Sequence, residues 1–517
     1  MVVATGHLGG FDVTVALDGT AALQEHAVRP FVGGRLASLA RRHHVPGAQL
    51  AIHHVSTQDH QHRLRGAPLC DSTRDQHRLR GAPLCAGCTV AVEFGELEHG
   101  TRRRVTPGTA FPVGSITKTF TATTAMILVA DGDLELDEPL GEYLPELRDL
   151  GDRLTLRQVL SHTGGLPAGP DSEDVRTATV RRYVLDHCRS AELVLPPGTG
   201  FSYSNLGFVL VGQLIAEITG MSWWDAVTSI LLRPLGIEPA VIDGLGLAAT
   251  GRPLATGHSV NPESGRTRPV RQSLAPAEAP AGGLAMSALD LVALGRLHLT
   301  DRPGLLPASQ LAQMRQPVPA ADPFGLADGW GLGLAMFEQA GFAPAGAASA
   351  PAGATWVGHD GNVDGTACYL RIDPVGGWVI ALTSNANTGL GLWQDLLAEL
   401  AGTDLPLAPP RIPVPPAETA APPAGCVGRY VNSDMEYVVT MRNGVLHLSV
   451  DDAPFVRLTC HPGLVFAHRD PVSGRPVIGG RFVLDARTGR VNALQIGGRL
   501  ARRLTRLGRE TERRLIA

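Results

Sequence analysis

The chain has 517 residues, of which 44% are hydrophobic and 18% charged, with a formal net charge of -4. This composition excludes a disordered chain and predicts one large domain with a smaller one beside it. No excess of Lys and Arg is present to neutralise phosphates, so we expect no nucleic-acid partner. The N-terminus lacks the regions of a signal peptide, and no apolar run reaches the roughly 18 residues of a spanning helix. We therefore expect a cytoplasmic protein that does not contact a membrane.

The first predicted elements are a helix and a strand, and the strand that should pair with the latter begins only after a long intervening segment. Residues 27–43 have helical spacing, and residues 47–54 form an apolar run typical of a strand. The next strand begins only at about residue 89, because the segment HRLRGAPLC occurs twice in between. Residues 55–88 are therefore interpreted as a duplicated loop insert in the hairpin.

The insert contains candidate metal ligands, namely His60, His62, Cys70, His77, Cys85 and Cys88. The last two form a C-x-x-C pair, which is able in principle to hold zinc. The duplication explains most of this clustering, and no second pair completes a site. We therefore expect a surface loop, with no metal and no cofactor.

A serine and a lysine follow at the start of a predicted helix. Ser115 and Lys118 are three positions apart, and the helix is expected to run to about Asp131, where Gly132 supplies the C-cap. This spacing places both side chains on one face of the helix. A serine hydroxyl needs an adjacent base to act as a nucleophile, and a desolvated lysine is able to serve.

Two further motifs strengthen this interpretation. Tyr203 and Asn205 alternate in the loop that precedes an apolar helix, so both side chains are expected to point the same way. His359 and Gly361 precede a predicted hairpin, and the glycine leaves room for a substrate backbone beside the strand. The order S-x-x-K, Y-x-N, H-x-G is hard to obtain by chance.

The C-terminal part differs in composition from the rest. Repeated prolines mark residues 406–425 as a linker between a catalytic domain at 1–405 and a small domain at 426–517. In the small domain, short alternating segments are separated by Gly and Asp turns, as in the turn at 442–444. This pattern predicts an antiparallel β-barrel or curled sheet.

With these motifs, the chain resembles the serine β-lactamase and penicillin-binding-protein family, in the branch of class C β-lactamases, DD-peptidases and D-aminopeptidases. The resemblance covers about residues 30–400 and includes VLSHTGGLP (159–167), LELDEPLGEYLPEL (134–147) and PAGGLAMSALDLVALGRL (280–297). It implies an α+β (α/β) fold, in which an antiparallel sheet with flanking helices is joined to an all-helical subdomain. A small lipocalin-like barrel would follow.

The resemblance also implies roles for the motif residues. Ser115 would attack the acyl carbonyl, and Lys118 would accept or orient its proton. Tyr203 would carry a proton to the leaving group, and Asn205 would bind Lys118 or a substrate amide. Which of Lys118 and Tyr203 is the resting base stays open.

The third motif would form the other side of the site. His359 stands where many relatives carry the lysine of K-T-G. The backbone amides of Ser115 and Asn362 would form an oxyanion hole, with Asp360 and Gly361 beside the substrate. A histidine is a poorer permanent cation than lysine at neutral pH, which makes β-lactamase activity less favoured.

Within this family, the chain is most similar to stand-alone penicillin-binding-protein-type thioesterases, through FGELEHGTRRRVTPGTAFPVGSITKTFTA, VRRYVLDHC (180–188) and GMSWWDAV (220–227). Such enzymes release and cyclise nonribosomal peptides head-to-tail, with a D-residue at the acyl end. The expected partner is thus a peptidyl thioester or ester, either free or attached to a carrier protein. Alternatives are a D-amino-acid-specific peptidase or esterase, a β-lactamase-like hydrolase, and a non-catalytic peptide-binding protein.

Overall fold

The computed structural model describes most of the chain, namely residues 3–8, 11–16, 21–55, 88–170, 175–242, 251–299, 305–338, 355–401, 415–469, 476–485 and 487–504. The predicted loop insert at 55–88 lies outside the described residues, except at its two ends. The first part of the predicted linker at 406–425 lies outside them as well.

Two compact units make up the chain, and each is discontinuous in sequence. The first unit comprises Met1–Asp131, Trp224–Arg315 and Phe337–Pro410. The second comprises Gly132–Trp223, Gln316–Met336 and Arg411–Ala517. The C-terminal strands therefore belong to the same unit as the central helices. The domain boundaries at 405 and 426 stay predictions.

The first unit is built on an antiparallel sheet with the order β4-β3-β13-β12-β11. Its strands are β3 (Gly47–His54), β4 (Cys88–Gly95), β11 (Thr355–Val363), β12 (Thr366–Asp373) and β13 (Trp378–Ser384). Every residue of β12 and β13 is buried, which explains their nearly continuous apolar runs.

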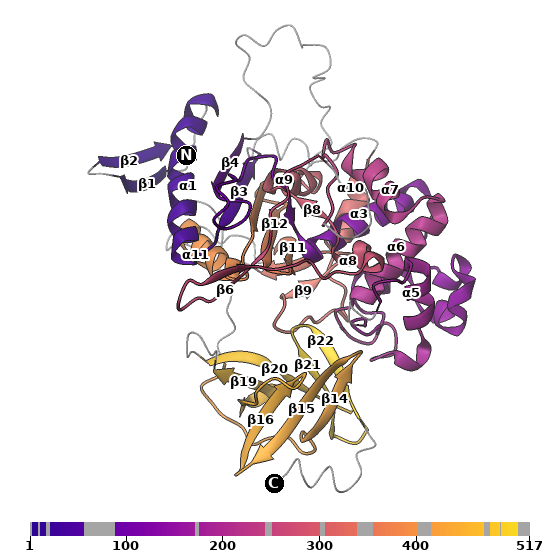
Figure 1. The fold of residues 1–517 in the computed structure, drawn as a ribbon. Helices are drawn as coiled ribbons and strands as arrows, with labels where there is room; N and C mark the ends of the chain where they lie inside the picture. The colour runs from indigo at the N-terminus through magenta and orange to yellow at the C-terminus, as the bar shows by residue number, and fades with distance from the viewer. Residues whose placement is uncertain are drawn as a thin grey trace, which may run out of the picture. The chain divides into compact units, whose positions relative to one another are not determined.

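Helices cover both faces of this sheet. On one face, α1 (Ala21–Arg42) packs against α11 (Gly389–Ala401), as Figure 1 shows. Their leucines share a core with alternate strand residues such as Leu50 and Ile380. On the other face lies α9 (Ala288–Leu297), where a side chain added at Gly295 would meet Val379 within 2.5 Å.

The remaining elements of the first unit are short, apart from the helix that follows the predicted nucleophile. They are β1 (Val3–Leu8), β2 (Phe11–Ala16), β5 (Phe111–Pro112), η1 (Gly114–Ile116), α3 (Thr117–Asp131), η5 (Val227–Leu232), β6 (His258–Val260), β7 (Thr267–Pro269), η6 (Pro276–Glu278), α8 (Ala279–Gly282), β8 (Ala285–Met286) and α10 (Ala308–Met314). Strand β5 pairs with β8 and so joins the segment before η1 to the segment before α9.

The second unit begins with helices. These are η2 (Leu140–Glu142), η3 (Pro145–Arg153), α4 (Leu156–Leu160), α5 (Val180–His187), η4 (Ser190–Glu192) and α6 (Asn205–Thr219). The helix α6 is apolar and buried along most of its length. Two elements, α7 (Trp223–Ala226) and β10 (Ala335–Glu338), cross from one unit to the other, and β10 pairs with β9 (Gly329–Trp330).

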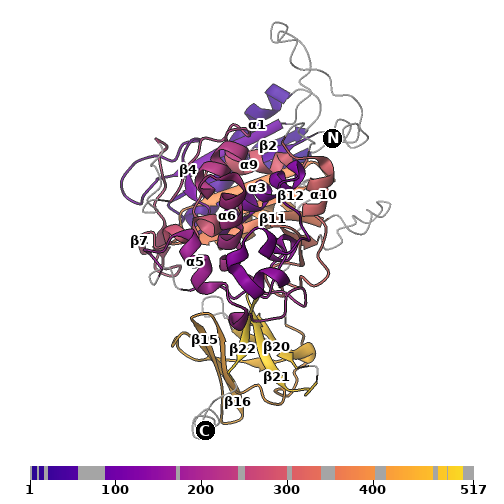
Figure 2. The same cartoon turned by 90° about the vertical axis from the view of Figure 1, so that its right-hand side faces the viewer.

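The same unit ends in a nearly closed barrel. Its nine described strands have the order β17-β16-β15-β14-β22-β21-β20-β19-β18 and curl around one core (Figures 1 and 2). They are β14 (Gly428–Asn432), β15 (Met435–Arg442), β16 (Val445–Val450), β17 (Val456–Arg457), β18 (Thr459–Cys460), β19 (Val465–Arg469), β20 (Pro476–Leu484), β21 (Val491–Ile496) and β22 (Arg499–Arg503), with η7 (Pro462–Leu464) before β19.

The predicted turn after Arg442 is present in the barrel. Arg442 pairs with Val445, and the two residues between them, Asn443 and Gly444, have φ values of 50° and 76°. Two positive φ values are what a tight two-residue hairpin requires, and Asn-Gly is the sequence that best tolerates them. The expected α+β fold with a C-terminal antiparallel barrel is confirmed.

A search for membrane spans gave one finding. Among the described residues, no single helix is long and apolar enough to cross a bilayer, although the bent pair Asn205–Thr219 with Trp223–Leu232 meets the length and composition criteria jointly.

Candidate active site

The serine and lysine of the first motif are in contact. Lys118 Nζ lies 3.1 Å from Ser115 Oγ and donates a second hydrogen bond of 2.8 Å to the Ala281 carbonyl oxygen. The lysine is 1% exposed, whereas Ser115 is partly accessible. The first motif thus provides a reachable hydroxyl with a buried amine against it, as a general-base-assisted nucleophile requires.

The segment around Ala281 is fixed to the helix α3 at further points. Thr117 Oγ1 accepts from the Leu284 amide at 3.1 Å, and Thr121 Oγ1 donates to the Pro280 carbonyl at 2.8 Å. Sequence reasoning missed Ala281 as a partner of Lys118, because a backbone carbonyl leaves no side-chain signature. The only signal was the family-like stretch at 280–297, to which no role was assigned.

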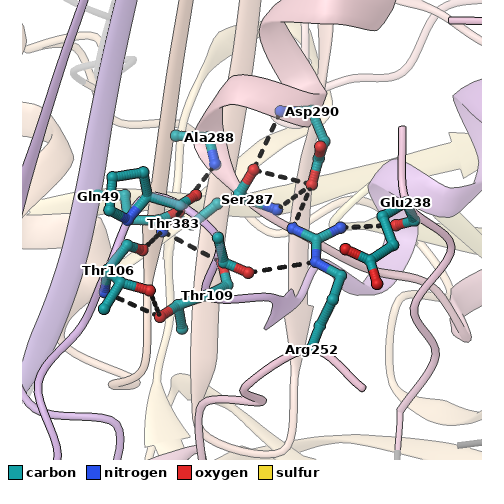
Figure 3. Close-up of polar contacts among 11 residues, drawn as sticks. Gln49, Thr106, Thr109, Glu238, Arg252, Ser287, Ala288, Asp290 and Thr383 are labelled. Atoms are coloured by element: carbon teal, nitrogen blue, oxygen red, sulfur yellow. Dashed lines mark hydrogen bonds and ion pairs between the residues drawn. The ribbon is translucent and has the colours of Figure 1, made fainter. Parts of the chain in front are cut away.

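A buried glutamine fixes the loop that leads to β5 (Figure 3). Gln49 Nε2 donates to the carbonyls of Thr106 at 2.7 Å and Thr109 at 3.1 Å. Its Oε1 accepts from the Ala288 amide at 2.9 Å and from the Thr383 hydroxyl at 3.1 Å. One side chain therefore joins two central strands, the N-terminus of α9 and the segment before Ser115. A fully bonded buried amide of this kind specifies a single arrangement.

The third motif places backbone against backbone. A side chain added at Gly361 would lie 1.8 Å from the Val113 carbonyl oxygen. One added at Gly114, where φ is 51°, would lie 2.8 Å from the Asn362 carbonyl oxygen. Only glycines allow this approach. The Asn362 backbone thus lies beside the residue that precedes Ser115, an arrangement compatible with the predicted oxyanion hole.

His359 is buried and neutral at pH 7. It is 3% exposed, and its Nδ1 lies 2.6 Å from the Asp360 carbonyl oxygen. Burial, with the nearby charge of Lys118 as the second cause, lowers the pKa of His359 from 6.5 to about 4. Because a neutral imidazole must place its proton on the nitrogen that faces a carbonyl, Nδ1 is the donor and Nε2 an acceptor. His359 therefore does not supply the positive charge of a K-T-G lysine.

The neighbouring carboxylate has a partner that the sequence did not indicate. Asp360 forms an ion pair with Arg371 of the adjacent strand β12, and the Arg371 guanidinium stacks 3.6 Å from the centroid of the Phe337 ring. Arg371 is 6% exposed, so the pair brings a charge into the sheet together with its counter-charge. Asp360 thus neutralises Arg371 in this unit, and its predicted contact with substrate stays a prediction.

The second motif lies in the second unit. Tyr203 is 6% exposed, with its ring centroid 4.3 Å from that of His162 and 5.8 Å from that of Trp330. The Arg499 guanidinium lies 5.4 Å from the Tyr203 ring. Asn205 opens α6, and its buried Oδ1 has no hydrogen-bond donor among the described residues. Such an atom is costly to bury, which suits a group that binds a ligand.

His162 holds both sides of Tyr203 and was missed at the sequence level. Its carbonyl accepts from the Ser202 amide at 3.0 Å, and its Nδ1 accepts from the Ser204 amide at 3.1 Å. His162 has a φ of 57°, a left-handed conformation that is uncommon outside glycine and that His tolerates better than most other side chains. The signal was the stretch VLSHTGGLP, which was noted only as a family resemblance.

The predicted site residues thus fall into two groups, one in each unit. Ser115, Lys118, His359, Asp360, Gly361 and Asn362 belong to the first unit, and Tyr203 and Asn205 to the second. Among the described ranges, no group of three or more His, Cys, Asp or Glu side chains is arranged to hold a metal ion.

Comparison with known proteins decides the family. A family model described as Beta-lactamase matches residues 34–402, most of the chain. The chain belongs to the β-lactamase family. It is therefore a serine hydrolase-type enzyme, related to penicillin-binding proteins.

The similarity to known relatives extends over most of the length of each relative and supports this assignment. The chain is 31% identical to penicillin-binding protein 4 of Amycolatopsis lactamdurans over 414 residues, covering 76% of this chain and 96% of the relative. Among solved structures, SurE is 38% identical with a TM-score of 0.75, over 93% of this chain and all of SurE. D-amino acid amidase from Ochrobactrum anthropi SV3 is 22% identical over 69% of this chain and 92% of the amidase, with a TM-score of 0.53. That last likeness concerns the fold alone.

Proposed function

We propose that this enzyme forms a covalent acyl intermediate on Ser115 and uses it to release and cyclise a nonribosomal peptide, head to tail, from a thioester or ester. The observation that carries the proposal is the hydrogen bond between the buried Lys118 amine and the Ser115 hydroxyl. No other activating group for Ser115 is needed, because the lysine at the start of α3 lies within hydrogen-bond distance of the hydroxyl, which the structure places in η1 and not in the helix itself.

The reaction has two halves with one intermediate. Ser115 Oγ bonds to the acyl carbon while Lys118 takes up or orients the hydroxyl proton, and the amides of Ser115 and Asn362 stabilise the oxyanion. The thiol or alcohol leaves with a proton that Tyr203 delivers. The peptide's own amine then attacks the same carbon and loses a proton, and Ser115 Oγ regains one. Asn205 positions Lys118 or a substrate amide throughout.

The neutral state of His359 favours a thioester over a carboxylate-bearing substrate. β-Lactams and peptides that end in a free carboxylate carry a negative charge close to the bond that is cut. A neutral imidazole whose Nε2 accepts a hydrogen bond offers no charge to that group. A peptidyl thioester has no such carboxylate, and its own N–H groups are donors that suit an acceptor nitrogen.

A D-residue at the acyl end is part of the proposal. The solved structures with SurE include one described as SurE with D-Leu, which is 38% identical to this chain with a TM-score of 0.73. We extend that stereochemistry to the acyl residue bound here, with a carrier protein as the donor in the cell. The D-specific peptidase or esterase activity differs only in the final acceptor, so it is an outcome of the test below.

The test compares two fates of one acyl-enzyme. A short peptidyl thioester that ends in a D-residue and has a free amine should give mainly cyclic product, which has lost one leaving group. The same peptide with an acetylated amine should give slow hydrolysis, since no tethered nucleophile remains. An L-residue at the acyl end is the matched control and should react poorly. Linear acid alone from the free-amine substrate, with rapid turnover of small D-amino-acid esters, would reassign the enzyme to the peptidase and esterase branch.

A further inference from the structure

A buried asparagine links the C-terminal barrel to the segment that carries Tyr203 and Asn205. Asn432 ends strand β14 and is 1% exposed. Its Oδ1 accepts from the Ala168 amide at 2.7 Å, and its Nδ2 donates to the Leu500 carbonyl at 2.8 Å. Both sides of the amide are therefore used, one for the helical part of the second unit and one for strand β22.

Ala168, the residue that Asn432 bonds, itself holds the start of α6. The Ala168 carbonyl accepts from the Asn205 amide at 3.0 Å and from the Leu206 amide at 3.1 Å. These are orphan donors at the first turn of a helix, which need an acceptor from outside the helix. Asn432 thus holds Ala168 in place, and the Ala168 carbonyl in turn holds the backbone amide of Asn205.

A second connection reaches the other side of Tyr203. The Ser202 hydroxyl oxygen accepts from the Leu500 amide at 3.3 Å, and the Gly498 carbonyl accepts from the Tyr203 amide at 2.9 Å. Gly498 has a φ of 75°, and a side chain there would meet Leu326 at 2.9 Å. Strand β22, whose Leu500 carbonyl is bonded to Asn432, therefore bonds to Ser202, and the glycine just before this strand bonds to Tyr203.

We propose that Asn432 is a positioning residue of the catalytic machinery, through which the barrel sets the placement of Tyr203 and Asn205. The barrel then contributes to catalysis, because the buried side-chain amide of Asn432 bonds both strand β22, at Leu500, and the backbone amide of Ala168. The inference rests on the proposed role of Tyr203 as the proton donor to the leaving group. Misplacement of a positioned group by about 1 Å is able to cost on the order of 100-fold in rate.

The leaving group provides a readout that a merely structural role would not change. An ethyl ester expels an alkoxide and needs a proton from Tyr203, whereas a p-nitrophenyl ester of the same D-acyl group expels a stable anion and needs it much less. The ratio of kcat/KM for the two esters reports general-acid catalysis. This ratio is independent of the fraction of enzyme that is folded, because both substrates are measured on one preparation.

The experiment compares variants at and beside Asn432. Asn432→Ala should lower kcat/KM for the ethyl ester at least about tenfold more than for the p-nitrophenyl ester, approaching the loss in Tyr203→Phe. Asn432→Asp retains the acceptor for the Ala168 amide but loses the donor to the Leu500 carbonyl, so it should restore only part of the ratio. Ser433→Ala is the matched control, since Ser433 bonds the next amide, that of Gly169, from an exposed position. It should leave the ratio unchanged.

A double variant separates the inference from the proposed function. In Tyr203→Phe, the further change Asn432→Ala should leave the ratio of the two esters unchanged, because Tyr203 alone protonates the leaving group and any loss through Asn205 is shared by both esters. Equal losses on both esters in Asn432→Ala, or a further change of the ratio in the double variant, would overturn the inference alone. If Tyr203→Phe itself leaves the ratio unchanged, the proton-donor assignment fails and the inference fails with it. If Asn432→Ala does not fold, Asn432→Ser replaces it, as its side chain is too short to reach both partners.

Discussion

The ionisation of His359 allows a quantitative prediction. Burial and the charge of Lys118 lower its pKa from 6.5 to about 4. Between these two values the unfolded chain binds a proton at His359 that the folded chain does not. The free energy of unfolding therefore falls as the pH is lowered through this window. The difference of about 2.5 between the two pKa values corresponds to a loss of about 3 kcal/mol in the free energy of unfolding. This loss is absent above pH 6.5 and complete below about pH 4.

The assay is a histidine titration by NMR with ¹³C-labelled imidazole carbons. The signal of His359, identified by its loss in His359→Gln, should titrate with a midpoint well below 5. Lys118→Met should raise this midpoint, because the ammonium beside the imidazole is removed. The His359→Gln variant should also lose about 3 kcal/mol less stability than the wild type between pH 7 and pH 4. A midpoint near 6.5 that Lys118→Met does not move would refute the argument for a neutral, buried imidazole.

Three more changes test other parts of the account. Gly361→Ala should abolish acylation and lower the melting temperature, because the added methyl would meet the Val113 carbonyl; a variant with normal labelling would contradict the close approach. His298→Leu should stabilise the protein more at pH 4 than at pH 7 in urea unfolding, since burial lowers the pKa of His298 to about 3 and neither buried ring nitrogen has a hydrogen-bond partner in the described part of the chain; an equal effect at both pH values would count against this. Deletion of residues 57–86 should leave the catalytic part folded, and a melting temperature reduced by more than about ten degrees would show that the insert is structural.

Local patterns in the sequence predicted much of the fold. The glycine at 132 predicted the end of α3 at Asp131, and alternation with Asn-Gly at the turn predicted the strands β15 and β16. Gly361 was expected to leave space beside its strand, and the structure shows that this space is filled by the Val113 backbone. The helix and the hairpin depend on neighbours in sequence, which a single chain displays directly, whereas the contact between Gly361 and Val113 joins distant segments.

Contacts between segments far apart in the chain could not be predicted from the sequence. Lys118 bonds to Ala281, Asp360 pairs with Arg371 across a strand register, and Asn432 bonds to Ala168. Backbone acceptors and amide side chains at these positions carry no local signature, because tertiary packing alone selects the partner. For the same reason, the strands after 426 were expected as a separate domain, and their hydrogen bonds to the segment around Tyr203 were not anticipated.

The most direct test of the central claim is the mass of the intact enzyme during turnover. On mixing with a D-acyl thioester whose amine is acetylated, the wild-type chain should gain the mass of the acyl group, and peptide mapping should place it on Ser115. The control is Ser115→Ala, which should gain no mass and release no thiol above background, while it keeps the melting temperature of the wild type. An acyl adduct that persists in Ser115→Ala, or turnover by that variant, would contradict the assignment of Ser115 as the nucleophile.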